Sequence, residues 1–233
     1  MNPLSRPVLS IAVLSAVIVL VSLGTWQLYR LEWKLGLIDA VETRMNSEPL
    51  SLTQVLARPM ENREWQAVAF DATGQGDRVA HVVGSHDGKP GYFVFTLATL
   101  ANGGELPVNH GFVPNEAKAE EYDLGLPGRI EGLYRRPREL KGFAKSITPP
   151  PDKDKGLFYA RNVEGPIAYL FGETPPGEAF YIDRTDNADA VPEGGTSLVE
   201  FSNNHLGYAL TWYGLAIGLI AVYIVMLRGK PPA

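Results

Sequence analysis

The chain has 233 residues, of which 45% are hydrophobic and 20% charged, with a formal net charge of −5 and no cysteine. The composition excludes a disordered chain, and the length predicts one medium-sized domain with additional segments. Without cysteine, the chain has no disulfides, Cys-ligated zinc, thiolate copper site or C-x-x-C-H attachment of c-type haem.

The first of two apolar blocks runs from Pro7 to Leu28, and as far as Leu23 its only polar residues are three serines. It reaches the roughly 20 residues that a ~30 Å hydrocarbon core requires, so we expect a transmembrane helix over residues 7–28. Ser22-Leu23-Gly24 has the small-x-small form of a cleavage site, so a removed signal peptide is the alternative. Trp26 and Arg30 follow at once as interfacial anchors, which favours a retained helix.

The segment from Leu31 to Asn46 keeps apolar residues at helical spacing with charged residues between them. This pattern predicts a helix that emerges from the membrane. Glu48-Pro49 ends it, and residues 51–56 are a candidate short helix.

From Trp65 onward the sequence is typical of short strands separated by glycine and proline. Asp87-Gly88 and Asn102-Gly103-Gly104 are hairpin-type turns. Short helices are expected at 115–122 and 166–171, and the proline-rich residues 148–151 are expected in a surface loop. Strands are expected at residues 65–70, 78–83, 92–97, 106–109, 129–134, 157–161, 179–182 and 197–201. This spacing predicts a mixed, mainly antiparallel β (α+β) domain within residues 29–205, whose sheet closes or packs on itself.

The second apolar block, Leu206 to Leu227, contains no charged residue and predicts a second transmembrane helix. Basic residues close to a membrane segment are retained in the cytoplasm. Arg6 precedes the first block, and Arg228 and Lys230 follow the second. We therefore expect a multi-pass membrane protein with both termini cytoplasmic and the central domain in the periplasm.

The net charge of the part expected outside the cytoplasm indicates which partners it can bind. Arg30 and Lys34, just outside the first helix, oppose the predicted orientation weakly. Setting aside the three cytoplasmic basic residues leaves 18 of the 21 basic residues against 26 acidic ones, a net charge of −8. Such a surface repels phosphate backbones, which excludes nucleic acid as a partner. The lipid bilayer is the partner that the apolar blocks predict.

The chain contains no P-loop, dinucleotide fingerprint, G-x-S-x-G or H-E-x-x-H motif. On a strand, His81 and His86 lie on opposite faces, so solvated side chains are favoured over a metal pair. For His110, which follows a strand, we expect a structural hydrogen bond. These observations predict a protein that is not an enzyme.

His205, the fourth histidine, stands at the outer end of the second block, with Tyr208 and Trp212 following at i+3 and i+7. An ionisable side chain at a membrane boundary is a functional-site candidate, and neutral imidazole is a usual axial ligand of haem iron. The alternative is a helix end in an aromatic belt, with Asn203 or Asn204 as cap and His205 facing water. The residues alone leave both interpretations open.

A stripe of small residues follows on the same block, at Gly207, Thr211, Gly214 and Gly218. G-x-x-x-G spacing permits close approach of membrane helices. The two spans therefore pack together, or one of them packs on a foreign helix.

Two segments carry a more specific pattern. The first block ends in Gly24-Thr25-Trp26-Gln27-Leu28-Tyr29-Arg30, and the second starts at Asn203-Asn204-His205, followed by Tyr208-Ala209 and Thr211-Trp212. They resemble the G-x-W-Q-x-x-R and N-N-H-x-x-Y-A-x-T-W signatures of the Surfeit-locus (Surf or Shy) family of cytochrome c oxidase assembly factors. The resemblance covers essentially the whole chain.

The central part resembles the family more loosely. Val108 to Pro114 is similar to the family's V-N-R-G-W-V-P segment, but His110 replaces the arginine and Phe112 the tryptophan. Ala98 stands where the family has proline. These departures indicate a divergent branch.

The resemblance implies a factor that binds haem a, carries it transiently and aids its insertion into subunit I of cytochrome c oxidase, with a haem a synthase as a further candidate partner. It implies that His205 ligates the haem iron. A membrane-edge site suits haem a, because its farnesyl tail prefers lipid and its propionates prefer the polar boundary.

Further cofactor-binding candidates surround this histidine in the sequence. Trp26, Tyr208 and Trp212 are candidates to pack on the macrocycle. Arg30 and Lys34 are candidates to pair with propionates, or alternatively to reach phospholipid head groups.

A second function stays open, namely a scaffold that stabilises an oxidase assembly intermediate without holding haem. An outer-domain ligand sensor is disfavoured, because no cytoplasmic signalling domain is present. A bacterial inner membrane is expected rather than a mitochondrial one, since no Arg-rich presequence precedes the first block.

Overall fold

The computed structural model describes residues 5–116, 124–126, 128–175, 177–196 and 203–228. The chain divides into two compact units. The helical unit comprises Met1–Ala40 with Glu200–Ala233, and the outer domain comprises Val41–Val199.

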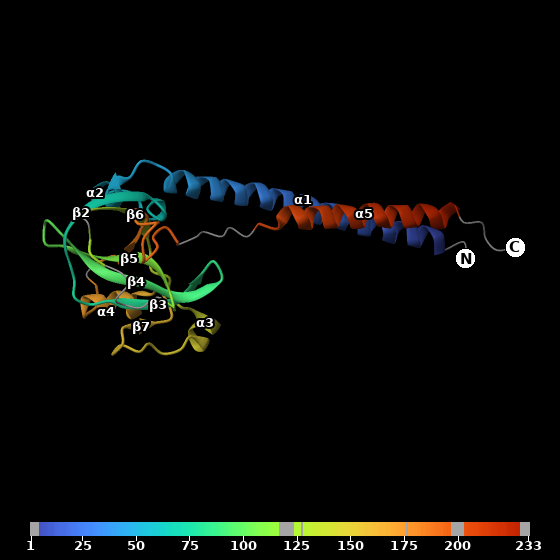
Figure 1. Cartoon of the computed structure of the whole chain (residues 1–233). Coiled ribbons are helices and arrows are strands. Elements are labelled where there is room, and N and C mark those ends of the chain that lie inside the picture. Colours follow the sequence, from blue (N-terminus) through green and yellow to red (C-terminus); the bar gives the residue numbers. More distant parts are fainter. Residues whose placement is uncertain (1–4, 117–123, 127, 176, 197–202, 229–233) are drawn as a thin grey trace. The chain divides into compact units, whose positions relative to one another are not determined.

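The helical unit contains two helices that are long and apolar enough to cross a membrane. Helix α1 runs without a break over Ser5–Met45, and helix α5 over His205–Arg228 (Figure 1). At 1.5 Å per residue, the 41 residues of α1 extend about 60 Å, twice the hydrocarbon thickness of a bilayer. The predicted continuation of the first span into an emerging helix is therefore confirmed.

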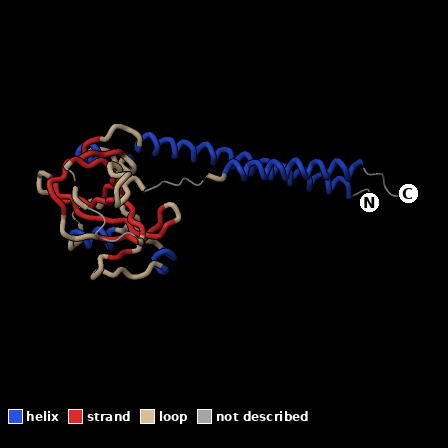
Figure 2. The backbone as a smooth tube through the Cα atoms, viewed as in Figure 1, coloured by secondary structure: helices blue, strands red, loops and turns tan. Residues whose placement is uncertain are grey.

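The outer domain is built around one eight-stranded sheet with the order β1-β2-β6-β8-β5-β4-β3-β7 (Figures 1 and 2). The strands are β1 Leu50–Ser51, β2 Ala67–Gln75, β3 Ala80–His86, β4 Lys89–Leu100, β5 Glu105–Pro114, β6 Arg129–Arg135, β7 Leu157–Phe158 and β8 Tyr181–Arg184. An additional antiparallel pairing of β2 with β4 closes β2, β6, β8, β5 and β4 into a ring. Only three pairings, β1–β2, β3–β7 and β5–β8, are parallel within the described residues. The predicted fold class, two membrane helices flanking a mainly antiparallel α+β domain, is confirmed.

Short helices complete the outer domain. They are α2 Leu52–Leu56, the 3₁₀ turn η1 Met60–Asn62, α3 Gly142–Ile147, the π-turn η3 Val163–Ile167 and α4 Ala168–Phe171. Helix α2 begins with a capping box, in which Ser51 and the side chain of Gln54 satisfy each other's backbone N–H groups.

Two apolar clusters lie on opposite faces of the sheet. The first draws residues from all five strands of the ring and from α2, so it fills the barrel interior: Val55, Val68, Phe70, Ala72, Ala98, Leu106, Val108, Ile130, Tyr134 and Ile182. The second lies outside the ring under η3 and α4: Ala80, Val82, Phe93, Phe95, Leu97, Phe112, Phe158, Ile167, Leu170 and Tyr181. Residues of β4 and β5 are buried on both faces for this reason.

The main difference between the predicted and observed strands is length. Strand β5 continues to Pro114 because a bulge at His110 and Gly111 lets the chain bend without leaving the sheet. Gly111 has φ +115°, and a Cβ at this position would meet the backbone of Glu193. Conversely, only Leu157 and Phe158 of the predicted strand 157–161 pair, with His81 and Val82.

Several predictions concern residues outside the described ranges. The expected strand 197–201 lies wholly there, as does most of the expected helix 115–122. The hairpin turns and the exposed proline-rich loop are confirmed, and η3 with α4 covers the helix expected at 166–171.

Candidate functional site

Helices α1 and α5 pack in antiparallel fashion along one seam. On α5 the least exposed side chains recur with the alternating three- and four-residue spacing of a coiled-coil seam: His205, Ala209, Trp212, Ala216, Leu219 and Tyr223. On α1 the matching positions are Ser10, Val13, Val17, Leu20, Gly24 and Gln27. The same spacing continues on α1 at Leu31 and Lys34, beyond the first residue of α5.

Gly24, one of the small residues expected on α1, lies in this contact, but the small residues of α5 in it differ from those expected. A Cβ on Gly24 would stand 2.9 Å from the ring of Tyr213, whereas Cβ atoms on Gly207, Gly214 or Gly218 would have no atom within 4 Å. Ala209 and Ala216 are the buried small residues of α5. Pairing of the two spans is therefore confirmed, but the glycine stripe of α5 faces away from α1.

Side-chain hydrogen bonds between described residues cross the seam. The hydroxyls of Ser10 and Tyr223 lie 2.5 Å apart, those of Thr25 and Tyr213 3.0 Å apart, and Nδ1 of His205 lies 2.7 Å from Oε1 of Gln27. Hydrogen bonds between membrane helices contribute about 0.6–2 kcal/mol each. Together they fix the register of the two helices.

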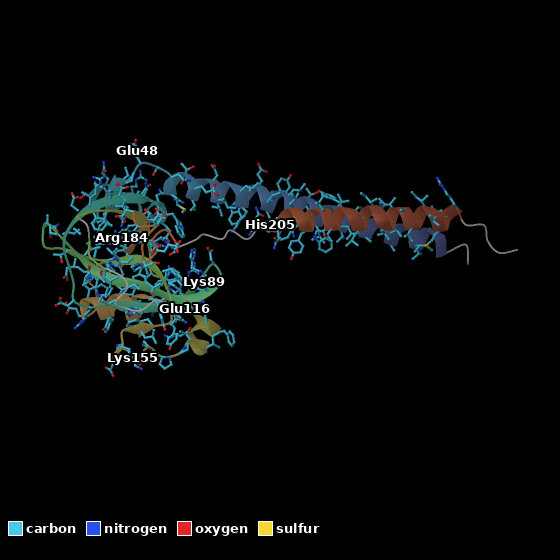
Figure 3. All side chains as sticks on the ribbon, viewed as in Figure 1. Glu48, Lys89, Glu116, Lys155, Arg184 and His205 are labelled. Carbon is cyan, nitrogen blue, oxygen red and sulfur yellow. The ribbon has the colours of Figure 1, made fainter. Side chains whose placement is uncertain are left out.

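His205 is the first residue of α5 (Figure 3). The carbonyl oxygen of Gln27 can only accept, so Nδ1 of the imidazole carries the hydrogen and donates it. In a neutral imidazole with this tautomer Nε2 keeps its lone pair. No hydrogen bond to Nε2 is found within the described ranges. Metal-ligating histidines in proteins have this arrangement, in which one ring nitrogen donates to a fixed acceptor and the other binds the metal.

The structure places the other predicted site residues in two groups. Trp212 and Lys34 lie on the seam face and are partly buried. Trp26 and Tyr208 are 53% and 56% exposed, and the guanidinium of Arg30 stacks 4.2 Å from the ring centre of Trp33. The exposed aromatic faces are open to lipid or to a flat ligand.

The outer-domain histidines are held by structural contacts, so the expectation that His81 and His86 are solvated is wrong. The side chain of His86 is 13% exposed and packs on Phe112, and the partly buried His81 packs on Tyr92.

His110 is fully buried, and its Nε2 lies 2.7 Å from the hydroxyl of Thr96, which confirms the expected structural hydrogen bond. Arg184 lies 3.4 Å from its Nδ1 (Figure 3). Because a guanidinium only donates, Nδ1 accepts and Nε2 donates to Thr96. His110 is therefore a buried structural residue.

The region of the chain that the structure describes holds no group of three or more His, Asp or Glu side chains able to bind a metal. Burial lowers the pKa of His81, whose ring meets Tyr92 edge-on. Burial and the neighbouring Glu178 raise the pKa of Tyr134 to about 12. These shifts belong to a packed core rather than to a catalytic cluster.

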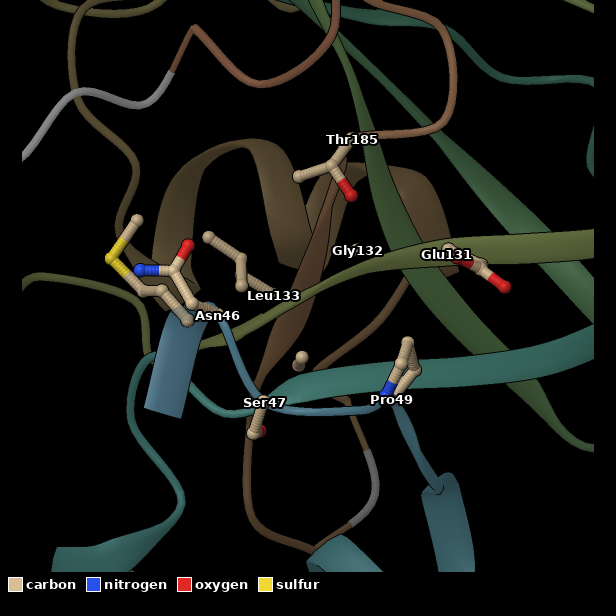
Figure 4. A pocket seen from close by; sticks show the side chains of 9 residues that line it. Asn46, Ser47, Pro49, Glu131, Gly132, Leu133 and Thr185 are labelled. Atoms are coloured by element: carbon tan, nitrogen blue, oxygen red, sulfur yellow. The ribbon is translucent and has the colours of Figure 1, made fainter. Parts of the chain in front are cut away.

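One pocket of about 350 Å³ opens in the outer domain between the end of α1 and strands β2 and β6 (Figure 4). Its lining is Met45, Asn46, Ser47, Pro49, Ala67, Glu131, Gly132, Leu133 and Thr185. None of the residues predicted to bind the cofactor is among them.

Sequence reasoning missed Gln27, although the residue is part of the motif at the end of the first block. The available signal was the seam spacing, which places Gln27 one turn beyond Gly24 on the same face. Without knowledge that this face meets α5, nothing distinguished Gln27 from the neighbouring interfacial residues.

Comparison with known proteins places the chain in a family. The model of the SURF1 family matches residues 14–217. Surfeit locus protein 1 of Gallus gallus is 30% identical over 83% of this chain and 67% of its own length, and that of Homo sapiens is 29% identical over 90% and 74%. The SURF1-like protein of Rickettsia felis is 23% identical over 94% of this chain and 96% of its own length. Because the matched region covers most of the chain, from within α1 through the outer domain and into α5, the chain belongs to the SURF1 family.

Proposed function

We propose that this protein is a non-enzymatic assembly factor of cytochrome c oxidase, which binds haem a and aids its insertion into subunit I. Membership of the SURF1 family supports the role in oxidase assembly. The observation that supports haem binding is the imidazole of His205, whose Nδ1 is engaged by Gln27 and whose Nε2 is available as a ligand.

The surroundings of His205 fit the haem group. Haem a would supply an iron that Nε2 of His205 could bind. Helix α5 begins at His205, and the seam face of α1 continues past that level with Leu31 and Lys34. A cation at Lys34 suits a propionate there, and the half-exposed Trp26 and Tyr208 offer ring faces toward the lipid.

We further propose a bacterial inner membrane as the location, with both termini cytoplasmic and the outer domain periplasmic. The two apolar helices and the bacterial relative support a membrane location in a bacterium. Subunit I is the proposed recipient of haem a, and a haem a synthase its proposed source.

A scaffold function is the second candidate, and the open glycine face of α5 favours it. A Cβ built at Gly207, Gly214 or Gly218 would meet no atom of another segment within 4 Å, so a foreign membrane helix could approach this face closely. A scaffold would bind the oxidase intermediate there without using His205.

The two candidates are separated by replacing the gene with a His205→Ala variant and purifying the oxidase from the membranes. The carrier function predicts oxidase with less haem a per subunit I, while the variant still co-purifies with subunit I. An oxidase with unchanged haem content would refute the carrier function and leave the scaffold. A Tyr223→Phe variant, which loses another hydrogen bond of the same seam, is the matched control and should assemble a normal oxidase.

A further inference from the structure

We propose that Gln27 is a positioning residue for His205: its side-chain oxygen holds the imidazole in the Nδ1–H tautomer and leaves Nε2 free to bind a metal. The inference deepens the proposed function and rests on it where haem is concerned. The tautomer itself is a property of the haem-free protein.

The geometry of the contact supports this role. Oε1 of Gln27 lies 2.7 Å from Nδ1 of His205, within the range of a strong N–H···O hydrogen bond. Both side chains lie on the seam and are partly buried, so water competes less for the amide oxygen than on an open surface. The bond joins residues 178 positions apart, so it depends on the register of the two helices.

A second set of contacts holds that register close to the site. Gly24, one turn before Gln27, lets the ring of Tyr213 approach α1, and the Tyr213 hydroxyl bonds to Thr25. This contact and this hydrogen bond hold α1 and α5 in register next to the Gln27–His205 hydrogen bond. Gln27 and His205 both lie on helices that pack against each other, so neither side chain is positioned by a loop.

The chemistry explains why a fixed acceptor matters. Neutral imidazole in water favours the hydrogen on Nε2, the nitrogen that a haem ligand must leave free. An acceptor held at Nδ1 reverses this preference and also fixes the orientation of the ring. Replacing such a partner typically weakens metal affinity by about 10- to 100-fold.

The first experiment is ¹⁵N NMR of the histidine side chains in the haem-free, full-length protein in detergent micelles. The chain has only four histidines, so the His205→Ala variant assigns the His205 signals by difference. The inference predicts a protonated Nδ1 and an unprotonated Nε2 in the wild type, and a shift toward the Nε2–H form in Gln27→Leu. Tyr223→Phe, which removes a seam bond at the other end of the pair, should leave the His205 signals unchanged.

The second experiment measures haem binding and the visible spectrum of the same variants. Gln27→Leu should lower haem affinity about 10- to 100-fold, whereas Gln27→Glu, which keeps an acceptor, should retain binding with a lower reduction potential because the carboxylate makes the ligand more basic. A wild type that binds haem, together with Gln27→Leu that binds equally well, would overturn the inference. A wild type that binds no haem would refute the proposed function, and the NMR result would still decide the tautomer. A wild-type His205 found in the Nε2–H form overturns the inference in either case.

Discussion

At the residue scale, the outer domain depends on one buried ionic cluster on β6 and β8. Arg135 donates to Asp183 at 2.7 Å and to Glu64 at 3.1 Å, and its guanidinium stacks 3.4 Å from the ring centre of Trp65. Asn109 donates to the second oxygen of Asp183. These contacts also hold Trp65 at φ 68°, a conformation that a bulky residue rarely adopts.

Arg135→Met should destabilise the protein strongly. The side chains of Arg135 and Asp183 are 11% and 3% exposed, and removing one member of a buried pair leaves the other charge uncompensated. We expect a loss of about 3–5 kcal/mol in the free energy of unfolding of the outer domain, measured by urea denaturation followed by tryptophan fluorescence.

Arg129→Met is the matched control on the same strand. Its ion pair with Glu131 is 65% and 44% exposed, so the loss should stay below about 1 kcal/mol. Equal losses for the two variants would contradict this account.

His81 should make stability depend on pH. Because burial lowers its pKa below the ordinary value of 6.5, protonation costs more in the folded than in the unfolded state. The stability is therefore complete above about pH 6.5 and is lost as the pH falls through the folded pKa. Thermal unfolding between pH 8 and pH 5 should show a smaller acid loss for His81→Gln than for the wild type. An identical pH dependence in both proteins would exclude this role of His81.

At the scale of elements, the helix pair presents two different faces. The seam is packed through Gly24, Ala209 and Ala216, while Gly214 and Gly218 are open. A larger side chain should therefore be tolerated on the open face and rejected on the seam.

Gly24→Leu should disturb the pairing of α1 with α5, because its side chain would displace the ring of Tyr213, a change that typically costs about 1–3 kcal/mol. The absence of cysteine makes spin labelling simple, with labels at the exposed positions Val19→Cys and Ile217→Cys. The distance distribution between the labels should broaden in Gly24→Leu and stay unchanged in Gly214→Leu. A narrow, unshifted distribution in Gly24→Leu would show that this contact does not set the pairing.

The elements that the sequence predicted well are those with local causes. The apolar blocks, the turn residues at Asp87-Gly88 and the helical spacing after Leu31 each act over a few residues, and the structure has the corresponding elements. The two-residue strand β1 escaped prediction because it is too short to carry a periodicity. Helix α3 escaped it because Lys141, the residue before it, provides no side-chain cap, whereas Ser51 caps α2. The sequence predicted a sheet that closes or packs on itself, but not which strands close it, because the pairing of β2 with β4 depends on long-range register.

In the candidate site, too, only the residue with a local sequence signal could be predicted. His205 could be found from its place at the end of an apolar block and from the motif around it. Gln27 could not, since its role exists only once α1 and α5 are paired. The predicted ligand and its positioning residue lie 178 positions apart in the sequence.

At the scale of the whole molecule, the predicted orientation can be tested with single cysteines in the cysteine-free chain. Asp154→Cys, in an exposed loop of the outer domain, should react with a membrane-impermeant maleimide in spheroplasts. A cysteine added after the last residue should react only once the membrane is broken, because Arg228 and Lys230 favour a cytoplasmic end. The reverse labelling pattern would invert the topology and place the outer domain in the cytoplasm.

His205 is the proposed ligand of haem a, at the end of the helix pair where α5 begins. The most direct test is the visible absorption spectrum of the detergent-purified protein, co-expressed with haem a synthesis, as wild type and as His205→Ala. The account predicts a haem a spectrum in the wild type that is lost or strongly reduced in the variant, with the outer domain still folded by circular dichroism. A colourless wild type, or a spectrum unchanged by the substitution, would contradict it and return His205 to the role of a helix-end residue.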